Sequence, residues 1–522
     1  SVQEISDKLT GGIMVSRSQS DFEQVYKDNA GRGHKTPVDY QDQINNVMGR
    51  LDYSASDRLD LSLSARYSDR NHNGITSTSY DSPFTKTHQA YGLTGESIYY
   101  GSTGNLTTKL SFDRAFDELD SESAIYAYHP SENYTGDSQY SGGYGDVRQQ
   151  QDTTSFSTQG QQNPISWGDT FHSLSTGLQV SQIDAFYEVE GDIIGETYRC
   201  LSGSASAGCN DSNGDGVHDE NDEYLRTRSV LSANKFNKTY QTYGAFIEDS
   251  ISAGNWTFNL GLRADYESLL ENVNIAPRTS MIWDTFGDES TVFTAGANRY
   301  YGRSFLRYAI NDTLRSWRTA YTYNSSGDIT RTTTYEDRSV ADYDLKTPYS
   351  DELSLAVAQK IGPMKATLKG VARDSKDGVQ RTRDDDNQYY YTNTGVSQYQ
   401  SVSLALETIK GFQIGSTLTH LEASISIQDS KSNSQSDNAY DETFNEDSIY
   451  YQGEVIYTDD LPSWDYSIPF NFRFSTTTEI PSWSLVWGNS INLHAGGKVA
   501  TDSGENIDIG DVSFDVYEDV KF

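Results

Sequence analysis

The sequence has few basic residues, few prolines and almost no cysteine, and it lacks any long hydrophobic run. Its 522 residues include 40 Lys and Arg against 75 Asp and Glu, which gives a formal net charge of −35. Because such a chain repels polyphosphate, the charge excludes nucleic-acid binding through a basic surface. No stretch approaches the roughly 18 consecutive apolar residues of a transmembrane helix, so a helical membrane protein is also excluded.

The only two cysteines, Cys200 and Cys209, lie close together in a polar segment. Without a second pair they favour one local disulfide in an oxidising compartment over a zinc knuckle. The sequence also contains no GxSxG, HExxH or phosphate-cradling glycine motif. Because these are the catalytic signatures readable from sequence, we do not expect an enzyme.

Aromatic residues are plentiful although only 35% of the chain is hydrophobic: there are 37 Tyr, 20 Phe and 7 Trp. Disordered chains are poor in aromatics, so we expect an ordered protein. In WTFNLGLRADYES one face carries only apolar side chains, namely Trp256, Phe258, Leu260, Leu262, Ala264 and Tyr266. RLDLSLSARYSD, WDYSIPFNFRF and WSLVWGNSINL alternate in the same way, which predicts β-strands.

The length of these strands and the position of their aromatics favour a membrane barrel. A run of about eleven residues suits a tilted membrane-spanning strand, whereas soluble strands usually have about five or six. Trp and Tyr at strand ends, with aliphatics between them, are typical of the aromatic girdles of outer-membrane barrels. The alternative is a large soluble β protein with ordinary aromatic cross-strand pairs.

Short and long connections alternate along the chain. Short turns are expected around Ser56, Gly254, Gly287 and Gly362, and long polar loops at roughly 117–168, 190–234, 302–348, 376–390 and 429–446. Short periplasmic turns and long extracellular loops are typical of outer-membrane barrels. We count 18 or 19 candidate strands and predict one domain over residues 1–522, an all-β, antiparallel, up-and-down transmembrane β-barrel of about 18–22 strands.

Two regions resemble the barrel of TonB-dependent outer-membrane receptors: TYGAFIEDSISAGNWTFNLGLRADYES with NIAPRTSMIWD, and LKTPYSDELSLAVAQKIGPMKATLKGVARDSKDGV with YTNTGVSQYQSVSLALET. The resemblance implies a bacterial outer-membrane receptor, surrounded by outer-membrane lipid. It would bind a scarce extracellular ligand and import it with energy from the TonB complex, which acts through an N-terminal plug. A surface lipoprotein caps the barrel in some relatives and is a possible partner.

The ends of the chain depart from the family pattern. Residues before about 45 are too few for a plug, and LTGGIMVSRSQS resembles the first barrel strand. At the other end DVYEDVKF finishes on Phe522, as complete outer-membrane barrels often do. We expect a fragment of a longer receptor without its plug and last strands. The alternatives are a smaller complete barrel acting as a passive porin, or a structural, adhesin-like barrel that binds surface proteins.

One segment, DSNGDGVHDEND at 211–222, has the spacing of a calcium loop. Oxygen ligands would come from the side chains of Asp211, Asn213, Asp215, Asp219 and Asp222 and from the carbonyl of Val217, while Gly216 allows the turn. The alternative is a solvated acidic turn. Calcium and the disulfide would together order the extracellular loop 190–234 for contact with a ligand.

Tyrosines are concentrated in the predicted loops. Flat contact area and a hydroxyl group suit Tyr for ligand recognition, so we assign ligand contact to Tyr126, Tyr128, Tyr140, Trp317 and Tyr390. The alternative is that these aromatics pack loops against one another at the barrel rim.

Overall fold

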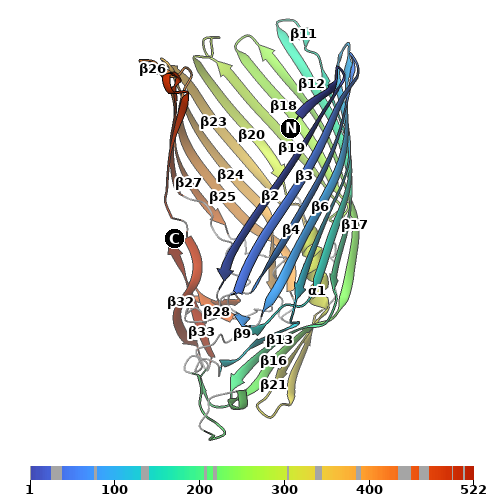
Figure 1. Cartoon of the computed structure of the whole chain (residues 1–522), viewed down its shortest axis with the longest axis vertical. Helices are drawn as coiled ribbons and strands as arrows, with labels where there is room; N and C mark the ends of the chain where they lie inside the picture. The colour runs from blue at the N-terminus through green and yellow to red at the C-terminus, as the bar shows by residue number, and fades with distance from the viewer. Residues whose placement is uncertain are drawn as a thin grey trace.

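The computed structural model describes residues 2–24, 38–75, 79–80, 82–130, 140–204, 208–215, 220–302, 305–335, 344–383, 389–432, 448–457, 469–496, 498–509 and 512–521. Its main element is a 20-stranded sheet that curls into a barrel (Figure 1). Over these ranges, no helix combines the length and the apolar character needed to cross a membrane.

The long strands pair antiparallel with their neighbours in chain order. They are β2 (Leu9–Gln24), β3 (Val38–Ser56), β4 (Leu59–Ile75), β6 (Pro83–Gly101), β7 (Gly104–Ser121), β10 (Val147–Gln162), β12 (Thr170–Val189), β17 (Asn234–Ala253), β18 (Trp256–Glu267), β19 (Asn272–Asp284), β20 (Thr291–Tyr301), β23 (Tyr349–Ile361), β24 (Met364–Arg383), β25 (Tyr389–Thr408), β27 (Thr417–Ser432), β30 (Phe470–Ile480) and β31 (Leu485–His494). Three short strands complete the sheet: β1 (Val2–Ser6), β11 (Ile165–Trp167) and β26 (Phe412–Ile414). The up-and-down topology and the predicted strand number are confirmed.

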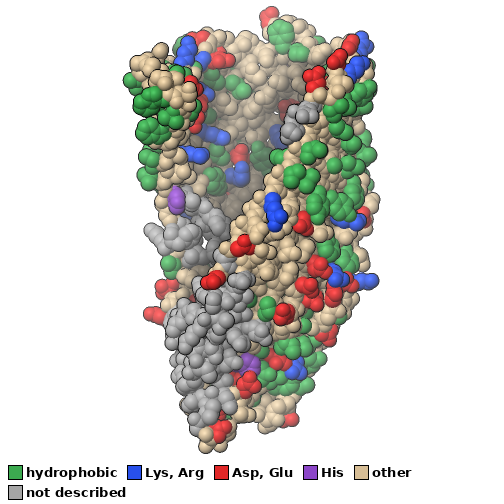
Figure 2. Space-filling model, in the orientation of Figure 1, with side chains coloured by type: hydrophobic (Ala, Val, Ile, Leu, Met, Phe, Trp, Pro, Cys, Tyr) green, Lys and Arg blue, Asp and Glu red, His purple; other side chains and the backbone are tan. Residues whose placement is uncertain are grey.

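The two-residue period of the strands separates an apolar outer face from a polar lumen. On the outer face Leu262 of β18 lies between Ile247 and Pro277 of the neighbouring strands, and Leu262 is 48% exposed although it is apolar. Figure 2 shows apolar side chains spread over the outer surface of the wall, with charged side chains gathered nearer the loop end. Outward exposure of apolar groups is stable only when lipid covers them.

The lumen face carries ion pairs that run across the strands. Arg66 of β4 and Asp113 of β7 form one, with Nη2 and Oδ1 2.6 Å apart. Gly92 of β6 stands in register between the two residues. A Cβ atom at Gly92 would lie only 2.2 Å from Asp113 Oδ1, so glycine is needed for the pair to form across β6.

Aromatic girdles mark both ends of the wall. At the short-turn end Trp256 stacks on Trp283 with ring centroids 4.9 Å apart. At the loop end Tyr243 pairs with Tyr266 at 6.0 Å. Indole and phenol rings prefer the membrane interface because one part is apolar and another is polar. The wall between the two girdles therefore corresponds to the lipid-exposed band.

The predicted short turns are confirmed, whereas several loop boundaries are wrong. Gly254 and Gly362 occupy turns with φ of +59° and +60°, where glycine is favoured. The loop predicted at 117–168 contains the barrel strand β10, whose outward face has only one large apolar side chain, Phe156, in VRQQQDTTSFSTQGQQ. The loop predicted at 376–390 is mostly strand, because β24 and β25 extend beyond the lipid band.

The last expected strands also differ from the structure. Trp483 lies in the 3-10 turn Pro481–Trp483 that precedes β31, and β30 begins only at Phe470, with residues 464–468 outside the described part. The terminal segment forms β33 (Val512–Lys521), which pairs with β32 (Lys498–Ile509) and β28 (Ser448–Tyr451), and β28 in turn pairs with β29 (Glu454–Tyr457). The expectation that DVYEDVKF is a barrel strand is therefore wrong.

The opposite faces of adjacent residues give a test of the membrane assignment. Leu355 of β23 points outward and is 67% exposed, whereas Ser354 points into the lumen. We expect Leu355→Arg to destabilise the folded barrel by about 2–4 kcal/mol because it places a charge in lipid. Ser354→Arg should cost much less. Unfolding in lipid vesicles by denaturant, followed by tryptophan fluorescence, measures both, and equal costs would contradict the assignment.

Candidate ligand-binding loops

Four loops at the same end of the barrel join into one seven-stranded sheet, the loop sheet, in the order β22-β21-β16-β13-β8-β9-β5. Its strands are β5 (Ser79–Tyr80), β8 (Ile125–Tyr128), β9 (Tyr140–Gly142), β13 (Ile193–Cys200), β16 (Glu223–Leu231), β21 (Arg318–Tyr323) and β22 (Ile329–Thr334). Figure 1 shows it below the barrel wall. Loops that pair by backbone hydrogen bonds form a structured surface, because each strand fixes its neighbour.

Helix α1 (Leu306–Ser316) connects the loop sheet to the barrel. Its Tyr308 packs in one buried cluster with Leu269 and Tyr391, and Leu314 packs in a second cluster with Ile193. These clusters combine residues from several loops and from barrel strand ends. Burial of this apolar surface holds the loop sheet against the barrel mouth.

Three of the predicted ligand-contact tyrosines lie together in the loop sheet. The rings of Tyr126 and Tyr140 stack with centroids 5.5 Å apart, and Tyr128 approaches Tyr140 at 5.0 Å. Tyr144 stacks on the other side of Tyr126 at 5.1 Å. Tyr126 is only 8% exposed. This packing is the arrangement expected from the loop-to-loop alternative, and ligand contact by the more open rings stays a prediction.

The other two aromatic candidates lie apart from this cluster. Trp317 follows α1 and packs against the second buried cluster, with the side chains of Arg315 and Arg318 buried on either side of it in sequence. Tyr390 is partly buried beside Tyr391, which is 2% exposed in the first cluster. The structure therefore brings three of the five predicted contact residues together and separates Trp317 and Tyr390 from them.

A polar chain that sequence reasoning missed connects β8 to β16. His129 stacks on Tyr198 at 4.3 Å, and its Nδ1 lies 2.9 Å from Oε2 of the buried Glu223. Tyr198 donates its hydroxyl hydrogen to Glu196, which accepts a second bond from Arg228. Burial, followed by the bond to Glu196, raises the pKa of Tyr198 to about 12. No sequence spacing relates these residues, because they come from separate loops.

The predicted disulfide joins Cys200 to Cys209 and is confirmed. It closes a short loop directly before the predicted calcium ligands. Cys200 pairs in register with Glu223, and the N–H of Leu201 donates to the carbonyl of Asp222 at 2.7 Å. The disulfide thus joins the start of the acidic segment to its end.

The acidic segment is described at both of its ends. Asp222 is fully buried and accepts from the N–H of Ser212 at 2.5 Å, and Asp211 accepts from Gly214 at 2.6 Å. Asn213 accepts from the N–H of Asp215 at 3.0 Å. Val217 and Asp219 lie outside the described residues. In the part of the chain that is described, no three His, Cys, Asp or Glu side chains cluster as metal ligands, and calcium binding stays a prediction.

The raised pKa of Tyr198 predicts how the loop sheet responds to alkali. The unfolded chain releases the Tyr198 proton near pH 10 and the folded chain near pH 12. The contribution of this group to stability is therefore complete below pH 10 and is lost as the pH rises to 12. Cleavage of the loops by an alkali-stable protease should accelerate over this range more in the native chain than in Tyr198→Phe. Equal acceleration would count against the assignment.

Comparisons with known proteins agree with the barrel assignment. No family model matches the chain. It is 28% identical over 512 residues to the uncharacterized protein YddB of Escherichia coli strain K12, covering 94% of this chain and 59% of that protein. The crystal structure of the outer membrane transporter YddB superposes with a TM-score of 0.73 at 25% identity, covering 100% of this chain and 66% of the other.

More distant structures share the fold. A mutant of the ferric enterobactin receptor PfeA of Pseudomonas aeruginosa gives a TM-score of 0.60 at 11% identity, covering 95% of this chain and 64% of the receptor. The FrpB iron transporter of Neisseria meningitidis gives 0.56 at 12%, covering 95% and 66%. The chain thus spans less than two thirds of these relatives. It is a barrel of the TonB-dependent receptor type, located in the bacterial outer membrane, and neighbours titled as transporters and receptors agree with a non-enzymatic protein.

Proposed function

We propose that the chain is the barrel of an outer-membrane uptake receptor that captures a scarce extracellular ligand on its loop sheet and admits it to the lumen. The observation that carries this proposal is the loop sheet itself, in which four separate loops form one ordered surface at the barrel mouth. A passive porin has no need of such a surface. Preordered loops lose less entropy on binding than separate mobile loops, which favours capture at low concentration.

The energy for import would come from the TonB complex, acting through a plug segment outside these 522 residues. Support comes from the likeness to an outer membrane transporter over the whole of this chain. Outer-membrane lipid would surround the wall, and a surface lipoprotein could dock on the loop sheet. The tyrosine cluster of Tyr126, Tyr128 and Tyr140 would provide the rim of the capture surface.

Co-purification tests the capture step. The protein is extracted from native outer membranes, and small molecules that remain bound are identified by mass spectrometry. We expect a bound molecule that is lost, by about tenfold or more, in Tyr128→Ala with Tyr140→Ala, because aromatic contact area is removed. Tyr243→Ala with Tyr266→Ala, which removes a girdle pair from the outer wall, is the matched control.

Two outcomes would favour the rival functions. Retention of no small molecule, together with steady ion conduction in planar bilayers by the whole protein from native membranes, would indicate a porin. Retention of a protein that requires the loop sheet, without any small molecule, would indicate an adhesin-like or scaffold barrel.

We also propose that residues 211–222 bind calcium through Asp211, Asn213, Asp215, Asp222, Asp219 and the Val217 carbonyl. Carboxylate, amide and carbonyl oxygens are the ligands that Ca²⁺ takes, and the site has enough of them. The disulfide supports the proposal because it holds both ends of the segment together. When bound, the ion would supply positive charge among these carboxylates, and the segment would hold β13 and β16 in place.

Calcium titration by calorimetry tests this proposal on the whole chain. We expect saturable binding with a dissociation constant on the order of 10⁻⁴–10⁻³ M, as in extracellular calcium modules. Asp215→Asn should weaken it at least about tenfold, because one charged ligand is lost. Asp328→Asn, in another acidic turn of the loop sheet, should leave it unchanged. The absence of saturable heat would contradict calcium binding.

A further inference from the structure

A pocket of about 290 Å³ opens in the lumen wall, away from the loop sheet. It lies across β7, β10, β12, β17 and β18. Its polar side chains are amides, hydroxyls and two cationic groups, and none of the ten lining residues, all in the described part of the chain, is acidic. That composition is unusual in a chain with 75 acidic and 40 basic residues. The pocket therefore departs from the electrostatic character of the rest of the protein.

Two glycines create the space for this pocket. Gly177 of β12 stands in register with Phe246 of β17, and a Cβ atom there would lie 2.3 Å from the Phe246 ring. Gly244 of β17 stands opposite Asp265 of β18, and a Cβ atom there would lie 2.8 Å from Nη2 of Arg263. The Phe246 ring and the Arg263 guanidinium therefore lie flat along the wall, where any larger residue at the two glycines would displace them.

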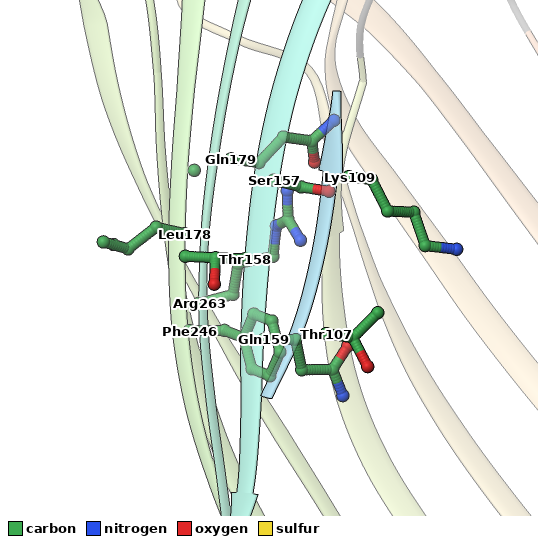
Figure 3. A pocket seen from close by; sticks show the side chains of 10 residues that line it. Thr107, Lys109, Ser157, Thr158, Gln159, Leu178, Gln179, Phe246 and Arg263 are labelled. Carbon is green, nitrogen blue, oxygen red and sulfur yellow. The ribbon is translucent and has the colours of Figure 1, made fainter. Parts of the chain in front are cut away.

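Arg263 is the charged group that can act inside the pocket. Its Nε and Nη2 donate to Asp265 at 2.8 and 2.7 Å, which fixes the plane of the guanidinium. Its Nη1 makes no hydrogen bond to the described residues, so two further N–H groups remain to donate. The other cation, Lys109, pairs with Glu96 at 2.5 Å and extends away from Arg263 (Figure 3).

The remaining lining groups indicate what accompanies the charge. Gln159 and Gln179 are both exposed to the lumen and provide amide donors and acceptors, and Ser157 adds a hydroxyl. Phe246 offers an aromatic ring. Amides and hydroxyls beside an aromatic ring bind hydroxylated carbon skeletons, and a fixed guanidinium binds carboxylate or phosphate oxygens.

We propose that this pocket binds a small hydroxylated oxyanion, such as a sugar acid or a sugar phosphate. Arg263 holds the oxyanion, Gln159 and Gln179 bond the hydroxyl groups, and Phe246 covers one face of the carbon skeleton. Binding to the lumen wall is measured without transport, so this inference stands or fails separately from the proposed uptake function.

Saturation-transfer NMR on the whole chain in deuterated detergent tests the proposal, with glucuronate and glucose as probes. We expect saturable transfer to glucuronate and an affinity for glucose at least about tenfold weaker, since one charge-assisted hydrogen bond contributes that much. Sugar phosphate should compete with glucuronate. Equal binding of glucose and glucuronate, or no saturable transfer to glucuronate, would overturn the proposal.

Variants assign the effect to the pocket. Arg263→Gln should reduce glucuronate binding to the level of glucose, and Gly244→Ala should do the same by displacing the guanidinium. Arg50→Gln is the matched control, because Arg50 forms the same two-residue pair with Asp52 on another part of the lumen wall. Gln179→Ala, at an exposed position that folding does not depend on, should weaken both sugars. A loss in Arg50→Gln as large as in Arg263→Gln would also overturn the proposal.

Discussion

Backbone hydrogen bonding in lipid is the constraint on which the rest of this structure depends. A membrane core offers no water, so every N–H and C=O group of the wall must bond to a neighbouring strand. The continuous antiparallel ladders from β2 to β31 meet that requirement. The same ladders impose a period of two, which sends Leu262 toward lipid and Arg263 toward the lumen. An acidic, weakly hydrophobic chain can therefore cross a membrane.

That period also leaves one wall face available for polar chemistry. Glycines at Gly92, Gly177 and Gly244 let long side chains from neighbouring strands lie flat across the lumen surface. At Gly92 the result is an ion pair, and at the other two positions it is a recessed pocket. A position without a side chain thus determines the position of its neighbours' charges.

Beyond the lipid band the constraint changes, because water can bond any backbone group that the loops leave open. The loops nevertheless pair with one another, and α1 anchors them through two buried clusters. Order in this region therefore results from apolar burial beneath the sheet and from the disulfide between Cys200 and Cys209. The capture surface and the conduit are stabilised by different interactions.

The sequence by itself determined the barrel wall, the short turns at Gly254 and Gly362 and the disulfide, because each rests on spacing within one short segment. β10 was misjudged because its outward face has too few large apolar residues to show the period. Only the tertiary structure decided the loop sheet, the His129–Glu223 contact and the Arg263 pocket. Their partners lie far apart in sequence, and local patterns carry no information about register between distant strands.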